Sequence, residues 1–190
     1  MSETLNVITI CGSLRKGSFN AALARALPSL APTGLKIVAG PQFSSFTPYD
    51  FDLQSEKGFP ADVTAFANAI RAADGVIIVS PEYNRTIPGA LKNAIDWVSR
   101  LQEQPFAGKP VALQSCSPSL LGGSRMQYHL RQCLTSVDAM LFGRPEVIVT
   151  FAPQKFDEKT LELKDQPTKD MIKQQLAGFE AFIRRVGAKK

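Results

Sequence analysis

The sequence predicts a doubly wound α/β fold built on five parallel strands, and three observations lead to it. Short apolar runs without polar alternation recur along the chain, as in strands that helices cover on both faces. Segments with helical spacing of apolar residues lie between these runs. Strands that alternate with helices form a parallel sheet, because right-handed crossovers connect parallel neighbours.

The expected strands are the five apolar runs, each short enough to cross a sheet once. They cover residues 5–11, 35–39, 75–80, 110–115 and 146–150.

The expected helices follow these runs, and each places its apolar residues on one face. The second helix, residues 62–73, is opened by Pro60. The other four are recognised by the apolar sets Leu23, Ala26, Leu27 and Leu30; Leu91, Ala94, Ile95, Val98 and Leu101; Met126, Leu130, Cys133, Leu134 and Val137; and Ile172, Leu176, Phe179, Ile183 and Val186.

Residues 40–59 and 152–167 show neither pattern, and we expect long loops there. The chain has no internal repeat and no low-complexity linker. Its 190 residues are enough for one well-buried domain and too few for two ordinary ones. We therefore expect a single domain over residues 1–190.

Composition favours a globular protein that works away from membranes and nucleic acids. Hydrophobic residues make up 44% of the chain and the net charge is +5, yet no apolar run approaches the roughly 20 residues of a membrane span. The amino terminus has no basic segment before its apolar stretch, so we expect no signal peptide and a cytoplasmic location. The basic cluster of Arg184, Arg185, Lys189 and Lys190 alone favours nucleic acid, and a solvated helix end explains it better.

Cysteine and histidine are too sparse for several kinds of site. Three cysteines without a CxxC pair argue against disulfides and structural zinc, and one histidine, His129, cannot form a catalytic triad. We expect Cys11 and Cys133 in the core, Cys116 in a ligand loop and His129 on a surface or interface. The sequence therefore predicts no metal ligand and no catalytic side chain.

The loop after the first strand, GSLRKGSFN at residues 12–20, has features of a phosphate site. Glycines allow a tight turn, and free amides at the start of the next helix attract an anion. Ser13 and Ser18 supply hydroxyls, and Arg15 supplies a charged fork for phosphate oxygens. The loop lacks the lysine of a Walker A motif, which leaves a compact phosphate, or a polar turn capped by serine, as its interpretation.

Two further loops follow strands three and four. Residues 80–84, SPEYN, join a fixed proline, a carboxylate, a ring and an amide, a mixture that suits a flat heterocycle. Residues 115–117 and 121–124 are rich in serine and glycine. In the flavodoxin-like order 2-1-3-4-5, strands one, three and four are neighbours at the switch point. The three loops are therefore expected to form one ligand crevice.

The segments GSLRKGSFN, PEYNRTIPGALKNAIDW and GGSRMQYHLRQ resemble the NADPH-dependent FMN reductase family, and its bacterial chromate and quinone reductase branch in particular. The resemblance covers nearly the whole chain. It implies non-covalent FMN, NADH or NADPH as donor, small-molecule electron acceptors, and a homo-oligomer that is a dimer of dimers. Donor and acceptor are expected to use the same face of the flavin ring in turn, which predicts hydride transfer by a ping-pong mechanism.

Carried onto this sequence, the resemblance assigns the FMN phosphate to Ser13, Arg15, Ser18, Phe19 and Asn20. It places Pro81, Glu82, Tyr83 and Asn84 along the flavin ring, with Ser117 nearby, and Arg125, Tyr128 and Glu146 at a subunit contact.

Arg85 departs from the family pattern, in which tyrosine often follows the PEYN turn. The departure affects subunit hydrogen bonding and puts a cation near the ring, where it favours anionic acceptors. Two other functions remain open: a non-enzymatic electron carrier of the flavodoxin type, and a module that binds a phosphate metabolite or nucleic acid.

Overall fold

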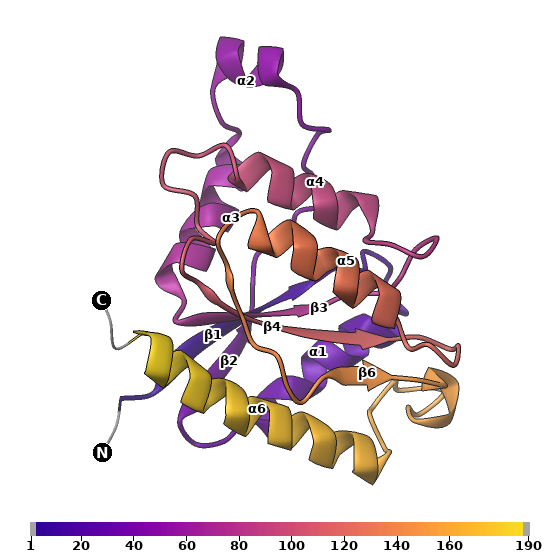
Figure 1. The fold of residues 1–190 in the computed structure, drawn as a ribbon. Coiled ribbons are helices and arrows are strands. Elements are labelled where there is room, and N and C mark those ends of the chain that lie inside the picture. Colours follow the sequence, from indigo (N-terminus) through magenta and orange to yellow (C-terminus); the bar gives the residue numbers. More distant parts are fainter. Residues whose placement is uncertain (1–2, 188–190) are drawn as a thin grey trace.

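A computed structural model describes residues 3–187 and has one parallel sheet at its centre, with helices on both faces (Figure 1). The strands are β1 (Leu5–Cys11), β2 (Leu35–Ala39), β3 (Gly75–Val79), β4 (Pro110–Cys116), β5 (Met140–Leu141) and β6 (Val147–Val149). The helices are α1 (Phe19–Leu30), α2 (Phe51–Lys57), α3 (Ala61–Ala72), α4 (Gly89–Val98), α5 (Ser124–Thr135) and α6 (Gln166–Gly187), with a 3-10 turn at Ala152–Gln154.

The sheet has the order β2-β1-β3-β4-β5, so the predicted flavodoxin-like topology is confirmed. Every residue of β3 and β4 is buried, as expected for central strands covered on both faces. The parallel register aligns Cys11 of β1 with Val79 of β3, and Val79 with Gln114 of β4. The carboxyl ends of these three strands therefore lie side by side at one edge.

The fifth position of the sheet differs in detail from the prediction. Two short strands occupy it: β5 pairs with the first half of β4, and β6 pairs with the second half. The expected strand at 146–150 corresponds to β6. The two residues of β5 form too short an apolar run to be recognised from periodicity.

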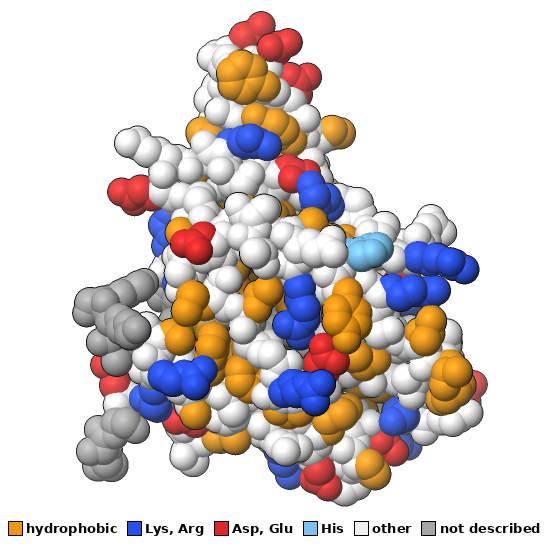
Figure 2. All heavy atoms as spheres, viewed as in Figure 1, with side chains coloured by type: hydrophobic (Ala, Val, Ile, Leu, Met, Phe, Trp, Pro, Cys, Tyr) orange, Lys and Arg blue, Asp and Glu red, His pale blue; other side chains and the backbone are white. Residues whose placement is uncertain are grey.

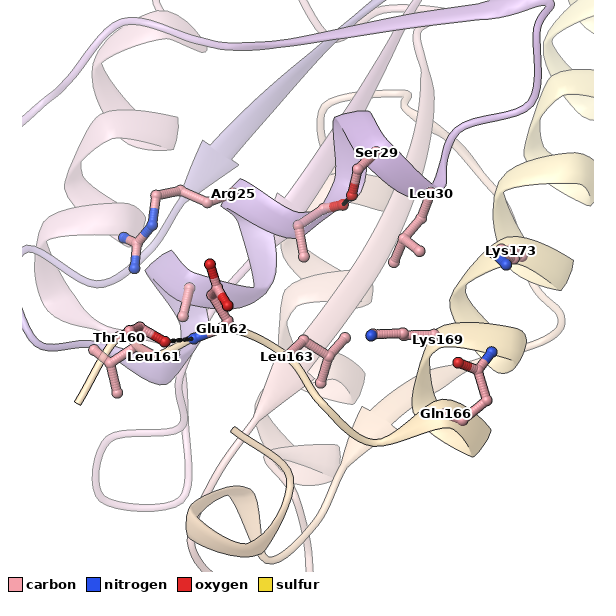
Figure 3. Close-up of a pocket in the computed structure, with 12 residues that line it drawn as sticks. Arg25, Ser29, Leu30, Thr160, Leu161, Glu162, Leu163, Gln166, Lys169 and Lys173 are labelled. Carbon is pink, nitrogen blue, oxygen red and sulfur yellow. Dashed lines mark hydrogen bonds between the residues drawn. The ribbon is translucent and has the colours of Figure 1, made fainter. Parts of the chain in front are cut away.

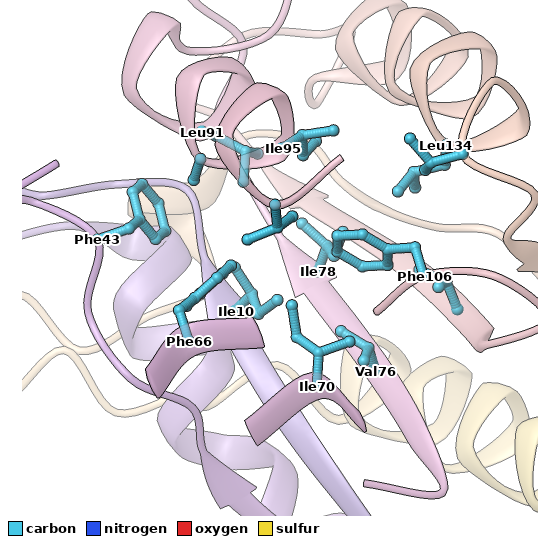
Figure 4. Packing of buried hydrophobic residues seen from close by; sticks show 14 of the residues in the cluster. Ile10, Phe43, Phe66, Ile70, Val76, Ile78, Leu91, Ile95, Phe106 and Leu134 are labelled. Atoms are coloured by element: carbon cyan, nitrogen blue, oxygen red, sulfur yellow. The ribbon is translucent and has the colours of Figure 1, made fainter. Parts of the chain in front are cut away.

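Two apolar clusters hold the helices onto the sheet. One lies between the sheet and α3, α4 and α5, and the other lies between the sheet, α1 and α6. Figure 4 shows the first, in which side chains from all three helices gather around Ile78 of β3. Labelled there from the helices are Phe66, Ile70, Leu91, Ile95 and Leu134.

The segment 40–59, expected to be a loop, contains α2. Asp50 caps this helix by accepting hydrogen bonds from the backbone N–H groups of Asp52 (2.8 Å) and Leu53 (3.2 Å). The helix has only seven residues and buries none of them, so its sequence carries no apolar stripe. It projects from the body of the molecule (Figure 1), and acidic side chains gather at its tip (Figure 2).

Among residues 3–187, no helix combines the length and the apolar character that crossing a membrane requires. Lys189 and Lys190 of the predicted basic cluster lie outside the described residues.

Candidate functional site

The loops that follow β1, β3 and β4 meet in one cleft at the carboxyl edge of the sheet, as the strand order predicts. The enclosed part of this cleft has a volume of about 160 Å³. Its lining consists of Ser13, Arg15, Ser18, Phe19, Asn20, Pro81, Glu82, Tyr83, Cys116, Ser117 and Pro118.

Every residue predicted to bind the cofactor lines this cleft except Asn84. Pro118 was not predicted, and Cys116 was expected in the loop without a role. Cys116 is the last residue of β4 and Pro118 follows two residues later, so extending the predicted loop 115–117 by one residue would have found Pro118.

The first loop presents groups that suit an anion. Ser18 caps α1, where its Oγ accepts hydrogen bonds from the N–H groups of Asn20 (3.1 Å) and Ala21 (3.3 Å). Ser13 is buried, and its Oγ has no hydrogen-bond partner. A buried hydroxyl without a partner is costly and indicates a missing ligand or water. Arg15 is exposed at the rim.

Gly12 lets this loop pass close to the end of β3. A Cβ atom at this position would lie 2.3 Å from Ser80 Oγ and 2.7 Å from Ser80 Cβ, closer than real contacts allow. The backbone N–H of Gly12 donates to the carbonyl of Val79 at 2.9 Å. Glycine is therefore required where the first and second loops touch.

Asn20 joins the first loop to the third. Its Nδ2 donates to the carbonyl of Cys116 at 2.8 Å, and its Oδ1 accepts from the Cys116 N–H at 3.0 Å. The side chain is buried and both of its polar atoms are engaged. Asn20 thus faces the cleft as a positioning residue, and its amide is not free to hold a phosphate.

Glu82 joins the second loop to the start of α5. Its carboxylate accepts a hydrogen bond from Arg125 Nε at 2.7 Å, forms an ion pair with Arg125 Nη2, and accepts from the Met126 N–H at 3.3 Å. A carboxylate at a helix start is stabilised by the helix dipole. The Glu82 charge is consequently neutralised within the chain.

Tyr83 and Thr86 close a tight hairpin, each donating its N–H to the carbonyl of the other at 3.1 and 3.0 Å. Asn84 and Arg85 form its tip, with left-handed φ values of 48° and 69°. Neither tip residue lines the cleft, and the Tyr83 side chain is 46% exposed at the cleft edge.

The three residues expected at a subunit contact lie outside the cleft. Tyr128 is 56% exposed on α5, and the carboxylate of Glu146 accepts from Arg131 Nη2 at 3.4 Å. Arg125 is engaged by Glu82. His129, expected at a surface or interface, is exposed on α5 (Figure 2), with Nδ1 2.8 Å from Thr86 Oγ1.

Cys116 is the one thiol in the cleft lining. Burial raises the pKa of this thiol to about 12, although nearby Lys155 acts in the opposite direction. A thiol with this pKa stays protonated near neutral pH and is a poor nucleophile. Within the described chain, no three side chains of histidine, cysteine, aspartate or glutamate are grouped as metal ligands.

Together these features define what the cleft can do. An unpartnered hydroxyl, an arginine and the start of α1 attract a compact anion at one end. A proline and an exposed tyrosine ring offer flat apolar surfaces at the other. The acidic and thiol groups of the lining are neutralised or protonated, so the cleft is suited to binding and orienting a reactive group rather than to acid–base catalysis.

Comparison with known proteins agrees with this geometry. The family model described as NADPH-dependent FMN reductase matches residues 5–154. A quinone reductase of Escherichia coli K12 is 53% identical over 186 residues, which are 98% of this chain and 99% of the relative. An NAD(P)H-dependent FMN reductase of Pseudomonas aeruginosa is 41% identical over the same shares of both chains.

Solved structures show the same fold. FerB, a flavoenzyme NAD(P)H:(acceptor) oxidoreductase from Paracoccus denitrificans, superposes with a TM-score of 0.85 at 29% identity, over 96% of this chain and 98% of that one. The apo form of EMOB, an NADH:FMN oxidoreductase, has a TM-score of 0.67 at 20% identity over 94% of this chain and 90% of that one. This second likeness concerns the fold alone.

Replacing Asn20 by alanine is expected to destabilise the protein by about 2–4 kcal/mol, because the N–H and carbonyl of Cys116 would both lose their buried partner. Urea unfolding of the two proteins measures the difference. Gln102→Ala is the control: it removes an exposed amide that forms no side-chain hydrogen bond among the described residues, and it should stay within about 0.5 kcal/mol of the original. Equal small losses for both variants would contradict the positioning role of Asn20.

Proposed function

Because this chain belongs to the NADPH-dependent FMN reductase family, we propose that it passes hydride from NADH or NADPH through bound FMN to quinones and to other acceptors such as chromate. The observation that carries the proposal is the buried, unpartnered Ser13 hydroxyl beside Arg15 and the start of α1. These groups fit the phosphate of FMN, which supplies the acceptor oxygens that they lack.

The remaining lining fits the rest of FMN. An enclosed volume of about 160 Å³ suffices for a phosphate and is smaller than the roughly 300–1,000 Å³ of typical small-molecule sites. The flat head of FMN would therefore lie toward the open edge, against Pro81 and Tyr83. Phe19 and Ser117 would border it. Asn84 would contribute through the shape of its turn, because it does not line the cleft.

In this proposal, the residues of the protein bind the cofactor and orient it. FMN, when bound, supplies two-electron transfer between a nicotinamide and an acceptor, so no side chain needs to perform that step. The Glu82 carboxylate forms an ion pair with Arg125, and this pairing favours a structural role for Glu82 over a general-acid role. Cys116 keeps its proton and so avoids side reactions at the floor of the cleft.

Donor and acceptor are proposed to use one open edge in turn. Tyr83 is exposed at this edge. A single position shared in turn by donor and acceptor would give ping-pong kinetics. The open edge also motivates the proposed dimer of dimers, in which Arg125, Tyr128 and Glu146 lie near a second copy. The expected cytoplasmic location stays a prediction.

The proposed activity is tested with the purified protein, a quinone and NADPH or NADH. We expect flavin absorbance between about 350 and 500 nm, NAD(P)H oxidation that depends on the quinone, and parallel double-reciprocal plots at several quinone concentrations. Flavin without NAD(P)H oxidation would favour the electron carrier. A colourless protein that gains no activity from added FMN would favour a binding module.

Arg15→Ala is expected to weaken FMN binding about 10- to 100-fold, because a charge-assisted hydrogen bond contributes roughly 1.5–3 kcal/mol. Flavin content after dialysis and titration of the apoprotein with FMN measure the loss. Lys16→Ala is the matched control: it removes a neighbouring exposed cation that does not line the cleft. Flavin retention that is unchanged in Arg15→Ala would exclude Arg15 from the phosphate site.

Arg85→Gln is expected to raise the KM for chromate or ferricyanide severalfold and to change the KM for a neutral quinone little. Arg85 is exposed and its guanidinium has no partner among the described residues, so it can attract anions near Tyr83. Arg85→Lys keeps the charge on the same left-handed turn and should preserve both values. A parallel rise for charged and neutral acceptors would refute the electrostatic role.

A further inference from the structure

A second, larger pocket lies along the flank of α1, opposite the first turns of α6 (Figure 3). Its volume is about 590 Å³, within the range of small-molecule sites, and none of its lining residues lines the cleft. The segment that precedes α6 forms its third wall. The lining residues used below are Arg25, Leu30, Glu162, Leu163, Lys169 and Lys173.

The floor of this pocket is apolar. Leu163 is buried and Leu30 and Leu161 are partly buried, and small alanine side chains of α1 complete the surface. Figure 3 shows Leu30 and Leu163 between the two helices. Such a surface favours contact with an apolar body over contact with water.

Cations without partners surround this floor. The side chains of Arg25, Lys169 and Lys173 form no hydrogen bond or ion pair among the described residues. In Figure 3, Lys169 reaches into the pocket from α6, and Arg25 lies at the opposite end, near residues 160–161. Glu162 is the one carboxylate of the lining, so positive charge is in excess.

Two cations of the same region are paired with carboxylates, whereas the Lys159 side chain forms no hydrogen bond or ion pair among the described residues. Lys164 forms an ion pair with Asp157, and Lys155 lies 3.5 Å from a carboxylate oxygen of Asp165. Asp165 also accepts from the Thr168 N–H at 2.9 Å. Asp157 and Asp165 are thus paired with lysines outside the pocket lining, and they do not neutralise the cations of the pocket.

The wall before α6 is ordered by its own hydrogen bonds. Asp157 accepts from the N–H groups of Lys159 (2.9 Å) and Thr160 (2.7 Å), and Phe156 pairs with Leu163 in an antiparallel bridge. These bonds hold Leu163 against α1 without any ligand. Because this wall is already ordered, less conformational entropy is lost when a ligand binds.

Lys169 and Lys173 stand one turn apart on the same face of α6, an arrangement in which like charges repel and weaken a helix. Asp170, three residues before Lys173 on α6, offsets part of this repulsion. An anion between α1 and α6 would convert this repulsion into two attractive contacts, with Arg25 available at the other end.

We propose that this pocket binds an amphipathic organic anion, an apolar body that ends in a carboxylate, sulfonate or phosphate. The apolar part lies on Leu30 and Leu163, and the anionic group lies toward Lys169 and Lys173. The site is independent of the flavin cleft, because α1 contributes its flank here and only its first turn there.

The test is calorimetric titration of the FMN-loaded protein with three probes: decanoate, its neutral counterpart decanol, and inorganic phosphate. We expect decanoate to saturate one site per chain and to bind about tenfold more tightly than either of the others, since it alone combines body and charge. Phosphate that binds as well as decanoate would overturn the proposal in favour of a bare anion site. Decanol that binds as well as decanoate would overturn the role of the cations.

The double variant Lys169→Gln/Lys173→Gln is expected to lower decanoate affinity about tenfold while its thermal midpoint stays unchanged or rises slightly. Lys36→Gln/Lys57→Gln is the matched control: it removes the same charge from exposed positions outside the pocket and should bind decanoate normally. Equal affinity in both double variants would place decanoate elsewhere and overturn the proposal.

Three further measurements distinguish the proposed ligand from other occupants of the pocket. Quinone reduction should be equally fast in the original protein and in Lys169→Gln/Lys173→Gln, and competition between decanoate and quinone would locate decanoate in the cleft instead. Cosedimentation with phosphatidylglycerol vesicles, in the absence of decanoate binding, would identify a membrane surface as the partner. A change of oligomeric state in the double variant would identify a second copy. Any of these three results overturns the proposal.

Discussion

The cleft depends on side chains that tie together loops from distant parts of the chain. Asn20 exchanges two hydrogen bonds with the backbone of Cys116, and so fixes the start of α1 to the end of β4. Glu82 fixes the loop after β3 to the start of α5 through Arg125 and Met126. Because these bonds join separate loops at the carboxyl edge of the sheet, they determine the shape of the cleft.

These bonds also determine the charge of the cleft. Both polar atoms of the Asn20 side chain are hydrogen-bonded to Cys116, and the Glu82 charge is neutralised by Arg125. The Ser13 hydroxyl and the Arg15 guanidinium stay available to bind a ligand. The available groups all favour an anion at the first loop. The opposite end is left with flat, weakly polar surfaces, a division that matches a cofactor with a charged tail and a planar head.

One helix borders both the cleft and the second pocket, with different parts of its surface. The first turn of α1 lines the cleft at the proposed phosphate site, where the positive end of the helix dipole favours an anion. Its flank meets the pocket against α6, where Arg25 joins two lysines over an apolar floor. The apolar face of α1 packs on the sheet between them and fixes both surfaces in one orientation. The two sites can therefore be altered separately by substitution.

The sequence by itself determined the order of strands and helices, and with it the meeting of three loops, because apolar periodicity and right-handed crossovers leave few alternatives. The family motifs predicted most of the cleft lining. Only the tertiary structure revealed the helix α2 and the two short strands at the fifth position of the sheet. The helix α2 and the strand β5 are too short for their apolar residues to form a recognisable pattern. Tertiary structure alone also decided the partners of Asn20 and Glu82, since bonds between residues 96 and 43 positions apart depend on distances and angles that spacing does not encode.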